Sequence, residues 1–485
     1  VLATATGATA PLARLTASGA TLTLRDVTTT GPQSFTATTG ITTQSTYTSS
    51  GADITFTGPV TAGEALVVTT GAGSAGDITF AGTLDSATGE NNALTLTAGS
   101  GDILLADHLG STESLGAVTI VQAAGVRAEG TLTAASFTQQ AGSGTTTLEG
   151  ALALSGNFAF TGGALTVNGS GNDIDGTLTV TNAGLFTTGN SADLTVGGAV
   201  TQNGAGAVVL GEDLTLDGAG ALDLLRGLTL QGEANETIVL TTAGSADDDI
   251  LLRSTVAHQN GESLTLHPGS AGDLTVSGAI DLASGNLAVT DAADATFSAT
   301  VTAGNFTQAA GSGTTTFAGA LDLGGDFAFT GQALTVNGSG HDIDGSMTVT
   351  NAGTFTTAEG ADLTVGTAFT QNGAGAVVLG DDLTSDSAGI SFLRGVTLTS
   401  GTAHDVLVLT TGGGTGDDLL FSATLDNADN ESLTLATGSG GDLTVTGAVG
   451  DLGDGDLRIT SARNATFSAT VAADRFTQLA GSGTT

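Results

Sequence analysis

The chain repeats itself at long range, and this repetition constrains its fold more than any other feature. The sequence TQNGAGAVVL runs from Thr201 to Leu210 and occurs again, unchanged, from Thr370 to Leu379. The tripeptide FTQ at Phe137 returns at Phe306 and Phe476, with spacings of 169 and 170 residues. Such self-similarity is typical of a module copied head to tail, in which each unit contacts mainly its neighbours along one axis. We therefore expect function to lie in length, surface and assembly more than in a single pocket.

The composition narrows the class of protein. Gly supplies 76 of 485 residues but Pro only 4, which excludes collagen. The 48 acidic residues face nine Arg and no Lys, so the net charge is −39. Because a polyanion repels nucleic acid and anionic lipid, we expect neither as a partner. The absence of Cys fits an extracellular bacterial chain without disulfides. No run of about 18 apolar residues is present that could span a membrane as a helix.

Local alternation with a period of two predicts short β-strands. The stretches Ala93–Thr97 (ALTLT) and Thr177–Thr181 (TLTVT) place Leu and Val on one face and mainly Thr on the other. NG dipeptides interrupt the strands, and both residues tolerate positive φ, so they mark corners. These dipeptides begin at Asn168, Asn203, Asn260, Asn337 and Asn372. The chain is therefore expected to be all-β.

Two all-β architectures compete: a row of β-sandwiches and a β-solenoid. A sandwich core about 10 Å thick is usually filled by large residues on longer strands. This chain has no Trp and one Tyr, Tyr47. Short strands with small inward residues favour a right-handed parallel β-helix with about 19 to 25 residues per coil. The 169-residue module would then contain roughly 7 to 9 coils, and the chain would form a rod on the order of 100 to 120 Å long.

The repeat boundaries divide the chain into four parts. Residues 1–136 form a partial module, 137–305 and 306–475 complete modules, and 476–485 the start of the next. The terminal AGSGTT stops inside a motif that continues elsewhere as GTTTLEG and GTTTFAG, so we expect the chain to be a segment of a longer protein. Gly211 to Gly227 is one residue longer than Gly380 to Gly395. An insertion inside a strand would reverse its faces, so this one is expected in a loop.

Several motifs together resemble a known group of proteins. The phrases ALTLTAGSGDI, SFTQQAGSGTTT, AVTQNGAGAVVL and ITFTGPVTAG resemble those of the long bacterial β-strand-repeat surface proteins and, more loosely, the filamentous-haemagglutinin-like adhesins. The resemblance covers nearly the whole chain. It implies a secreted, right-handed β-helical fibre at the bacterial cell surface, used for adhesion or for a cell-surface layer. The secretion domain of the haemagglutinin-like group is not recognisable in this sequence.

Catalytic chemistry has little support in the sequence. The five His residues do not recur at matching module positions, which is typical of surface side chains; they are His108, His258, His267, His341 and His404. No GxSxG motif or P-loop is present, and the Gly-rich stretches lack the Lys and the helix that hold phosphate. We therefore predict no catalytic, cofactor-binding or metal-binding residues, and no enzyme activity.

Acidic clusters are the best chemical candidates. They are Asp247–Asp249 with Asp417–Asp418, Asp173 and Asp175 with Asp342 and Asp344, and Glu212–Asp213 with Asp381–Asp382. Their oxygens could hold Ca²⁺, and Gly413–Phe421 (GGTGDDLLF) matches the calcium-roll nonapeptide once. A calcium roll needs tandem copies, and none follows. The competing interpretation, which we prefer, is that these carboxylates accept backbone N–H groups in solvated turns.

Two main hypotheses for function remain. The first is a structural or adhesive fibre that associates with itself or with other surface components. The second is a module that binds glycans or another cell through loops on one face. Rows of outward Thr also resemble an ice-binding surface, but Asp, Ser and Ala interrupt them, and β propensity explains them. A polysaccharide-active enzyme is the remaining alternative. For packing, we predict that Phe158, Phe160, Phe327 and Phe329 are interior.

Overall fold

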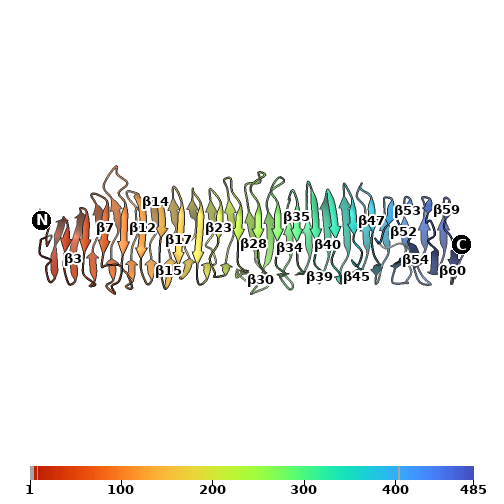
Figure 1. Cartoon of the computed structure of the whole chain (residues 1–485), viewed down its shortest axis with the longest axis horizontal. Coiled ribbons are helices and arrows are strands. Elements are labelled where there is room, and N and C mark those ends of the chain that lie inside the picture. The colour runs from red at the N-terminus through yellow and green to blue at the C-terminus, as the bar shows by residue number, and fades with distance from the viewer. Residues whose placement is uncertain (1–4, 8, 402–404) are drawn as a thin grey trace. The chain divides into compact units, whose positions relative to one another are not determined.

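A computed structural model describes residues 5–7, 9–401 and 405–485 of the chain. Its contacts group into two compact units, which we describe separately. Unit 1 contains residues 1–233 and 241–243, and unit 2 contains residues 234–240 and 244–485. Within each unit, parallel strands stack as successive turns of a β-solenoid, and no helix occurs in the described residues (Figure 1). The expected all-β parallel solenoid is confirmed.

From β14 onward, each turn of unit 1 contributes three strands, whereas some earlier strands pair two apart, such as β10 with β12. β14 pairs with β17, β17 with β20 and β20 with β23, so a strand pairs with the third strand after it. Phe137 lies opposite Phe158, and Phe158 lies opposite Leu178. These sequence separations agree with the expected coil length of about 19 to 25 residues. The strands of unit 1 are β1 (Leu15–Leu24), β2 (Val27–Thr28), β3 (Gln33–Thr43), β4 (Thr46–Thr48), β5 (Ile54–Thr57), β6 (Val60–Ala62), β7 (Leu66–Thr69), β8 (Ile78–Phe80), β9 (Leu84–Ser86), β10 (Leu94–Thr97), β11 (Ile103–Leu105), β12 (Leu115–Gln122), β13 (Val126–Ala128), β14 (Leu132–Gln139), β15 (Thr145–Leu148), β16 (Leu152–Leu154), β17 (Phe158–Gly162), β18 (Ala164–Val167), β19 (Asn172–Ile174), β20 (Leu178–Asn182), β21 (Phe186–Thr188), β22 (Leu194–Val196), β23 (Val200–Gln202), β24 (Val208–Leu210), β25 (Leu214–Leu216), β26 (Leu222–Leu224) and β27 (Leu228–Leu230); β28 spans Thr237–Thr241.

Unit 2 also has three strands per turn, and its strands form three parallel ladders that we call faces A, B and C. Face A comprises β31 (Ser263–His267), β34 (Leu287–Val289), β37 (Phe306–Gln308), β40 (Phe327–Gly331), β43 (Met347–Asn351), β46 (Phe369–Gln371), β49 (Ile390–Phe392), β52 (Leu419–Phe421), β55 (Leu443–Val445) and β58 (Ala465–Phe467). Face B comprises β29 (Ile250–Leu252), β32 (Leu274–Val276), β35 (Ala295–Phe297), β38 (Thr314–Phe317), β41 (Ala333–Val336), β44 (Phe355–Thr357), β47 (Val377–Leu379), β50 (Val396–Leu398), β53 (Leu425–Asn427), β56 (Val449–Asp451) and β59 (Val471–Ala472). Face C comprises β30 (Val256–His258), β33 (Ile280–Asp281), β36 (Val301–Ala303), β39 (Leu321–Leu323), β42 (His341–Ile343), β45 (Leu363–Val365), β48 (Leu383–Ser385), β51 (Val406–Thr410), β54 (Ser432–Ala436), β57 (Leu457–Ser461) and β60 (Phe476–Gln478).

One turn of unit 2 is longer than expected. Ile390 in β49 lies opposite Leu419 in β52, and their separation exceeds the expected upper limit of about 25 residues. The extra residues lie in the connections after β50 and β51, because the three strands themselves keep their usual short lengths. Loops lengthen at little cost in free energy, so strand pairing continues across this turn.

Within each unit, the core is a column of side chains enclosed by the parallel strand ladders. Most three-residue strands follow a buried–outward–buried pattern, so Leu, Ile, Val and Phe point inward. Phe158, Phe160, Phe327 and Phe329 are each at most 1% exposed, which confirms their predicted interior position. The ring centroids of Phe137 and Phe158 on adjacent turns lie 4.9 Å apart and nearly parallel. Such a pair adds about 0.5–1.5 kcal/mol to the stabilisation from burial alone.

The strictly repeated TQNGAG motif forms a corner that needs these residue types. In unit 1, the buried Gln202 side chain donates to Asn182 Oδ1 (2.7 Å) on the preceding turn and to the Gly206 carbonyl (2.9 Å). In unit 2, Gln371 donates to Asn351 Oδ1 at 2.7 Å. The glycines let the corner lie directly on the preceding turn, because a Cβ at Gly206 would overlap the Gly184 carbonyl. The buried hydrogen bonds require the Gln and Asn amides, and the close approach of adjacent backbones requires Gly. Together these two requirements explain why this motif recurs unchanged.

The one-residue difference between the two modules lies in a loop, as predicted. In unit 1, the segment between β25 and β26 covers residues 217–221. In unit 2, the equivalent segment between β48 and β49 covers residues 386–389. The flanking strands keep their buried–outward–buried pattern in both units, so the strand faces are unchanged.

Candidate functional site

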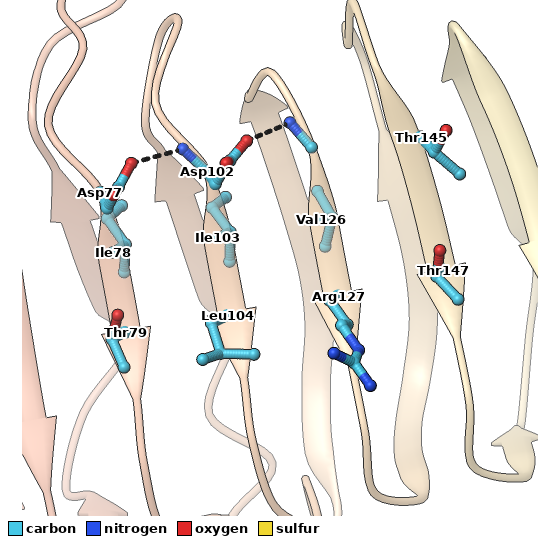
Figure 2. Close-up of a pocket in the computed structure, with 11 residues that line it drawn as sticks. Asp77, Ile78, Thr79, Asp102, Ile103, Leu104, Val126, Arg127, Thr145 and Thr147 are labelled. Atoms are coloured by element: carbon cyan, nitrogen blue, oxygen red, sulfur yellow. Dashed lines mark hydrogen bonds between the residues drawn. The ribbon is translucent and has the colours of Figure 1, made fainter.

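Unit 1 has a shallow groove of about 460 Å³ across the outer sides of β8, β11, β13 and β15. Two carboxylates, Asp77 and Asp102, lie along one edge of the groove, where the strands begin (Figure 2). Its remaining surface includes Thr79, Leu104, Arg127, Thr145 and Thr147. The groove therefore presents carboxylate and hydroxyl oxygens, the apolar side chain of Leu104 and a single guanidinium group.

The carboxylates of this groove hold successive turns together. Asp77 Oδ1 accepts the backbone N–H of Asp102 at 2.8 Å, and Asp102 Oδ1 accepts that of Gly125 at 2.8 Å (Figure 2). One turn earlier, Asp53 Oδ1 accepts the N–H of Asp77 at 3.0 Å. We call this series a side-chain oxygen ladder. Each carboxylate satisfies a backbone donor just before a strand, which would otherwise lack an acceptor on the preceding turn.

Arg127 belongs to a surface ion pair network. Its guanidinium lies 3.3 Å from Glu129 and 3.8 Å from Glu149, and its side chain is 59% exposed. Exposed pairs of this kind contribute about 0–1 kcal/mol. Arg127 is therefore held toward the two glutamates, and Asp77 and Asp102 have backbone N–H groups as their hydrogen-bond donors.

The oxygen ladder recurs twice in unit 2. In the first copy, Asp249 accepts the N–H of Asp273 (2.9 Å), Asp273 that of Asp294 (3.0 Å), and Asp294 that of Thr314 (2.6 Å). The second copy uses Asp418, Asp442, Asn464 and Thr484 in the same order, at 2.8, 3.1 and 3.0 Å. A groove of about 480 Å³ follows the second copy. The ladder is thus a repeated surface element of the module.

Arg463 pairs with the second ladder of unit 2. Its Nε donates to Asp442 Oδ1 at 2.8 Å and its Nη2 to Asp442 Oδ2 at 2.6 Å. These charge-assisted bonds, with the further donors from Asn464, lower the pKa of Asp442 to about 2. Asp442 therefore stays ionised through the whole neutral and mildly acidic range.

Several of the predicted acidic residues accept backbone N–H groups, as the preferred interpretation required. Asp248 is buried and accepts the N–H of Ser245 at 2.7 Å, and Asp417 accepts that of Gly414 at 2.6 Å. Asp249 and Asp418 begin the two oxygen ladders of unit 2, whereas Asp247 is exposed. The residues Asp173, Asp175, Asp342 and Asp344 are exposed on the outer surface. Glu212 accepts the N–H of Ser191 at 3.1 Å.

One group of three carboxylates has a metal-like arrangement. Among the residues that the structure describes, only Asp362, Asp381 and Asp382 place one oxygen each within 4.8 Å of one another. Burial, followed by the charge of Asp381, raises the pKa of Asp362, and burial also raises the pKa of Asp382. Their oxygens are partly occupied, because Asp381 accepts the N–H of Asp382 at 2.8 Å and Asp382 accepts that of Val408 at 2.7 Å. Hydrogen bonds to backbone N–H groups thus occupy one oxygen each of Asp381 and Asp382. Asp362, Asp381 and Asp382 are the described residues that could hold a hard cation.

Sequence reasoning missed several residues of these sites. Asp362 lies beside Asp382 because the strands that follow them, β45 and β48, pair on adjacent turns. Their separation in sequence equals about one coil, and this spacing was the signal that could have predicted their proximity. The module-equivalent Glu262 and Glu431 are fully buried at corners. Glu262 accepts the N–H of Asn260 at 2.7 Å, and Glu431 accepts that of Ser400 at 2.9 Å. Their recurrence at the same position of successive modules was the available signal.

The His residues divide into surface and core positions. His108 and His267 have side chains 50% and 43% exposed, in agreement with the prediction of surface positions. His258 is less exposed and accepts the N–H of Gly261 at 2.9 Å. His404 lies outside the described residues. The prediction is wrong for His341, which is 1% exposed, because its position on β42 points inward like that of Asn172 on β19 in unit 1.

His341 makes fewer hydrogen bonds than its counterpart. Asn172 accepts the N–H of Leu152 at 3.1 Å, and its Nδ2 donates to the carbonyls of Gly169 and Asp193. His341 Nδ1 accepts the N–H of Leu321 at 3.2 Å, but Nε2 has no hydrogen-bond partner among the described residues. Burial disfavours the imidazolium ion and lowers the pKa of His341 below its ordinary 6.5.

We expect His341→Asn to stabilise unit 2 by about 1 kcal/mol at pH 7, because the amide supplies the donors that Asn172 uses. The native imidazole stays neutral while the unfolded one takes up a proton below its ordinary pKa of 6.5. Wild-type unit 2 therefore loses stability as pH falls from 6.5 toward the lower native pKa, and the variant does not. Urea denaturation midpoints on either side of the ordinary imidazole pKa measure both effects. The reciprocal Asn172→His is the control and should create the same loss in unit 1; an identical pH dependence in His341→Asn and wild type would contradict the assignment.

Outward Thr residues form one continuous column on face B. The column consists of Thr275, Thr296, Thr316, Thr335 and Thr356, which are paired on successive turns. Val378 follows on the next turn and ends the run. Asp, Ser and Ala were expected to interrupt such rows, but over these five turns they do not. These Thr side chains are half-buried, and their outward positions on the strands are consistent with β propensity.

Comparison with known proteins adds no relative. No family model, no curated protein and no solved structure matches the chain. Among the described residues, no helix has the length and apolar character needed to cross a membrane.

Proposed function

We propose that this chain is the structural repeat region of a large, secreted bacterial cell-surface fibre or adhesin. Its coils act as an extended spacer for attachment, for a cell-surface layer or for filament assembly. The observation that carries the proposal is the role of the repeated polar side chains. The oxygen ladders and the TQNGAG corners join one turn to the next, as a fibre requires.

The acidic charge of the chain governs how copies of it would interact. With a net charge of −39, the chain repels anionic surfaces and other copies of itself at low ionic strength. Divalent cations would screen this charge and bring copies together. Self-association and contact with other cell-surface components are therefore the proposed interactions.

The alternative function is recognition of glycans or of another cell. It is favoured by the groove beside Asp77 and Asp102, whose carboxylate and hydroxyl oxygens can accept hydrogen bonds from sugar hydroxyl groups. In this alternative, binding of the glycan or cell would depend on the side chains of particular turns, whereas the function of a spacer depends on the number of turns.

Deleting one module distinguishes these two functions. Removal of residues 137–305 joins Ser136 to Phe306, which begins the same FTQ motif as Phe137, so the junction keeps its local sequence. We expect cells that carry the shortened protein to show shorter surface fibres in electron micrographs and to attach as well as wild type. Loss of attachment with intact surface display would favour the binding function. Failure of antibodies to label intact wild-type cells would contradict surface localisation.

A further inference from the structure

The repeat of this chain does not contain a whole number of solenoid turns. In unit 2, the motif DLTV occurs at Asp273–Val276 and, one module later, at Asp442–Val445. The first copy contains β32 and the second contains β55, so the repeat spans 55 − 32 = 23 strands. Each turn has three strands, because every strand pairs with the third one after it. Twenty-three strands are seven turns and two further strands.

Equivalent strands of unit 2 therefore lie on different faces. β32 belongs to face B, whereas its equivalent β55 belongs to face A. The FTQ strands β37 and β60 lie on faces A and C. The strands β36 and β59, which begin at Val301 and Val471, lie on faces C and B. All three pairs move by one face in the same direction around the coil, so the shift is a property of the module.

This rotation applies to the exposed features as well. The oxygen ladder of Asp273, Asp294 and Thr314 lies along the strand starts of face B. Its copy, with Asp442, Asn464 and Thr484, lies along face A. The two ladders have the same hydrogen bonds and different directions. A third copy, placed one further repeat along, would fall on face C, and a fourth would return to face B.

We propose that an array of this module presents each repeated surface feature on its three faces in rotation, so that contacts made once per module point in three directions around the fibre. This inference deepens the proposed function and rests on it. The partner is a second copy of the same array. Fibres whose contact sites point in three directions join into bundles or nets, whereas sites along a single face would give paired ribbons.

The absence of Cys allows a direct test on the whole chain. Thr275 and Thr444 are the outward residues of the equivalent strands β32 and β55. In the double variant T275C/T444C, both sites are coupled to biotin and decorated with streptavidin, and electron tomography locates the two particles. We expect them on different sides of the chain, about a third of a turn apart, because a turn has three faces.

A matched control uses two sites on one face. Asp426 is the outward residue of β53, which lies seven full turns after β32 on face B. In T275C/D426C, both particles should therefore lie on the same side of the chain. When biotin-labelled chains are in excess over streptavidin, each streptavidin particle can link several chains. The linked T275C/D426C chains should then form paired ribbons, whereas the linked T275C/T444C chains should form branched nets.

The result decides the inference independently of the proposed function. Particles on the same side in T275C/T444C would overturn the rotation of the repeat, and module deletion would still report on attachment. If the particles lie on different sides but the protein is absent from the cell surface, the rotation of the repeat stands and the proposed surface fibre is contradicted. Ribbons from both variants would also overturn the proposal.

Discussion

Replacing Phe158 by Asp will unfold its turn of unit 1 together with the adjacent turns. Phe158 is 1% exposed and stacks on Phe137 at 4.9 Å. The substitution removes an aromatic side chain, which costs about 3–5 kcal/mol by itself. It also places a carboxylate among apolar side chains without an ion-pair partner, which costs more. Because a solenoid turn is stabilised mainly by its neighbours, the loss spreads along the unit.

Circular dichroism during thermal unfolding measures this effect. We expect a lower transition temperature and an additional early transition from the affected turns. Ala159→Asp is the matched control, because Ala159 points outward on the same strand and the same ladder carries Asp223 at an outward position. It should unfold almost as wild type does. An unchanged melting profile for Phe158→Asp would show that this residue does not support the core.

Replacing Gly375 by Val will disrupt the TQNGAG corner of unit 2. A Cβ atom at Gly375 would overlap the carbonyl oxygen of Gly353 on the preceding turn, and it would also approach Asn351 Nδ2 at 2.8 Å. Asn351 Nδ2 donates to the Gly353 carbonyl at 2.7 Å and Asn351 Oδ1 accepts from Gln371, so displacing either group disturbs this hydrogen-bond network. Overpacking costs about 1–3 kcal/mol, and loss of the buried amide bonds adds about 1–3 kcal/mol.

The test is the denaturation midpoint of unit 2, with local opening followed by hydrogen exchange of residues 369–379. We expect faster exchange at this corner and a lower midpoint. Gly324→Val is the control, since a Cβ at Gly324 has no heavy atom within 4 Å and its φ is not positive. Equal midpoints for the two variants would mean that close approach of the backbone does not restrict this corner.

The architecture could be predicted because its signals are local. The strand TLTVT at Thr177–Thr181 alternates in sequence and in burial, with Leu178 and Val180 inside. The Phe pairs followed the same alternation and are interior. Coil length was also accessible, because the strand-like stretches recur at a regular spacing.

The polar interior was not predictable in this way. His341 was expected on the surface and is buried, because an inward position near a corner can hold an amide or an imidazole that bonds to the backbone. Glu262 and Glu431 are buried carboxylates for the same reason. In sequence, these residues look like loop residues. Their role depends on which backbone N–H groups point at them, and that depends on the fold of the corner.

The linear pattern of residues was sufficient to specify parallel coils with an aliphatic interior, since side-chain direction alternates along each strand whatever lies next to it. Only the folded chain reveals that each turn has three strands, that Asp362 lies close to Asp381 and Asp382, and that the repeat rotates by one face. These features depend on how many residues each corner uses before the next strand pairs. Corners of different length accommodate the same strand, so only hydrogen bonding between turns decides which residues become neighbours.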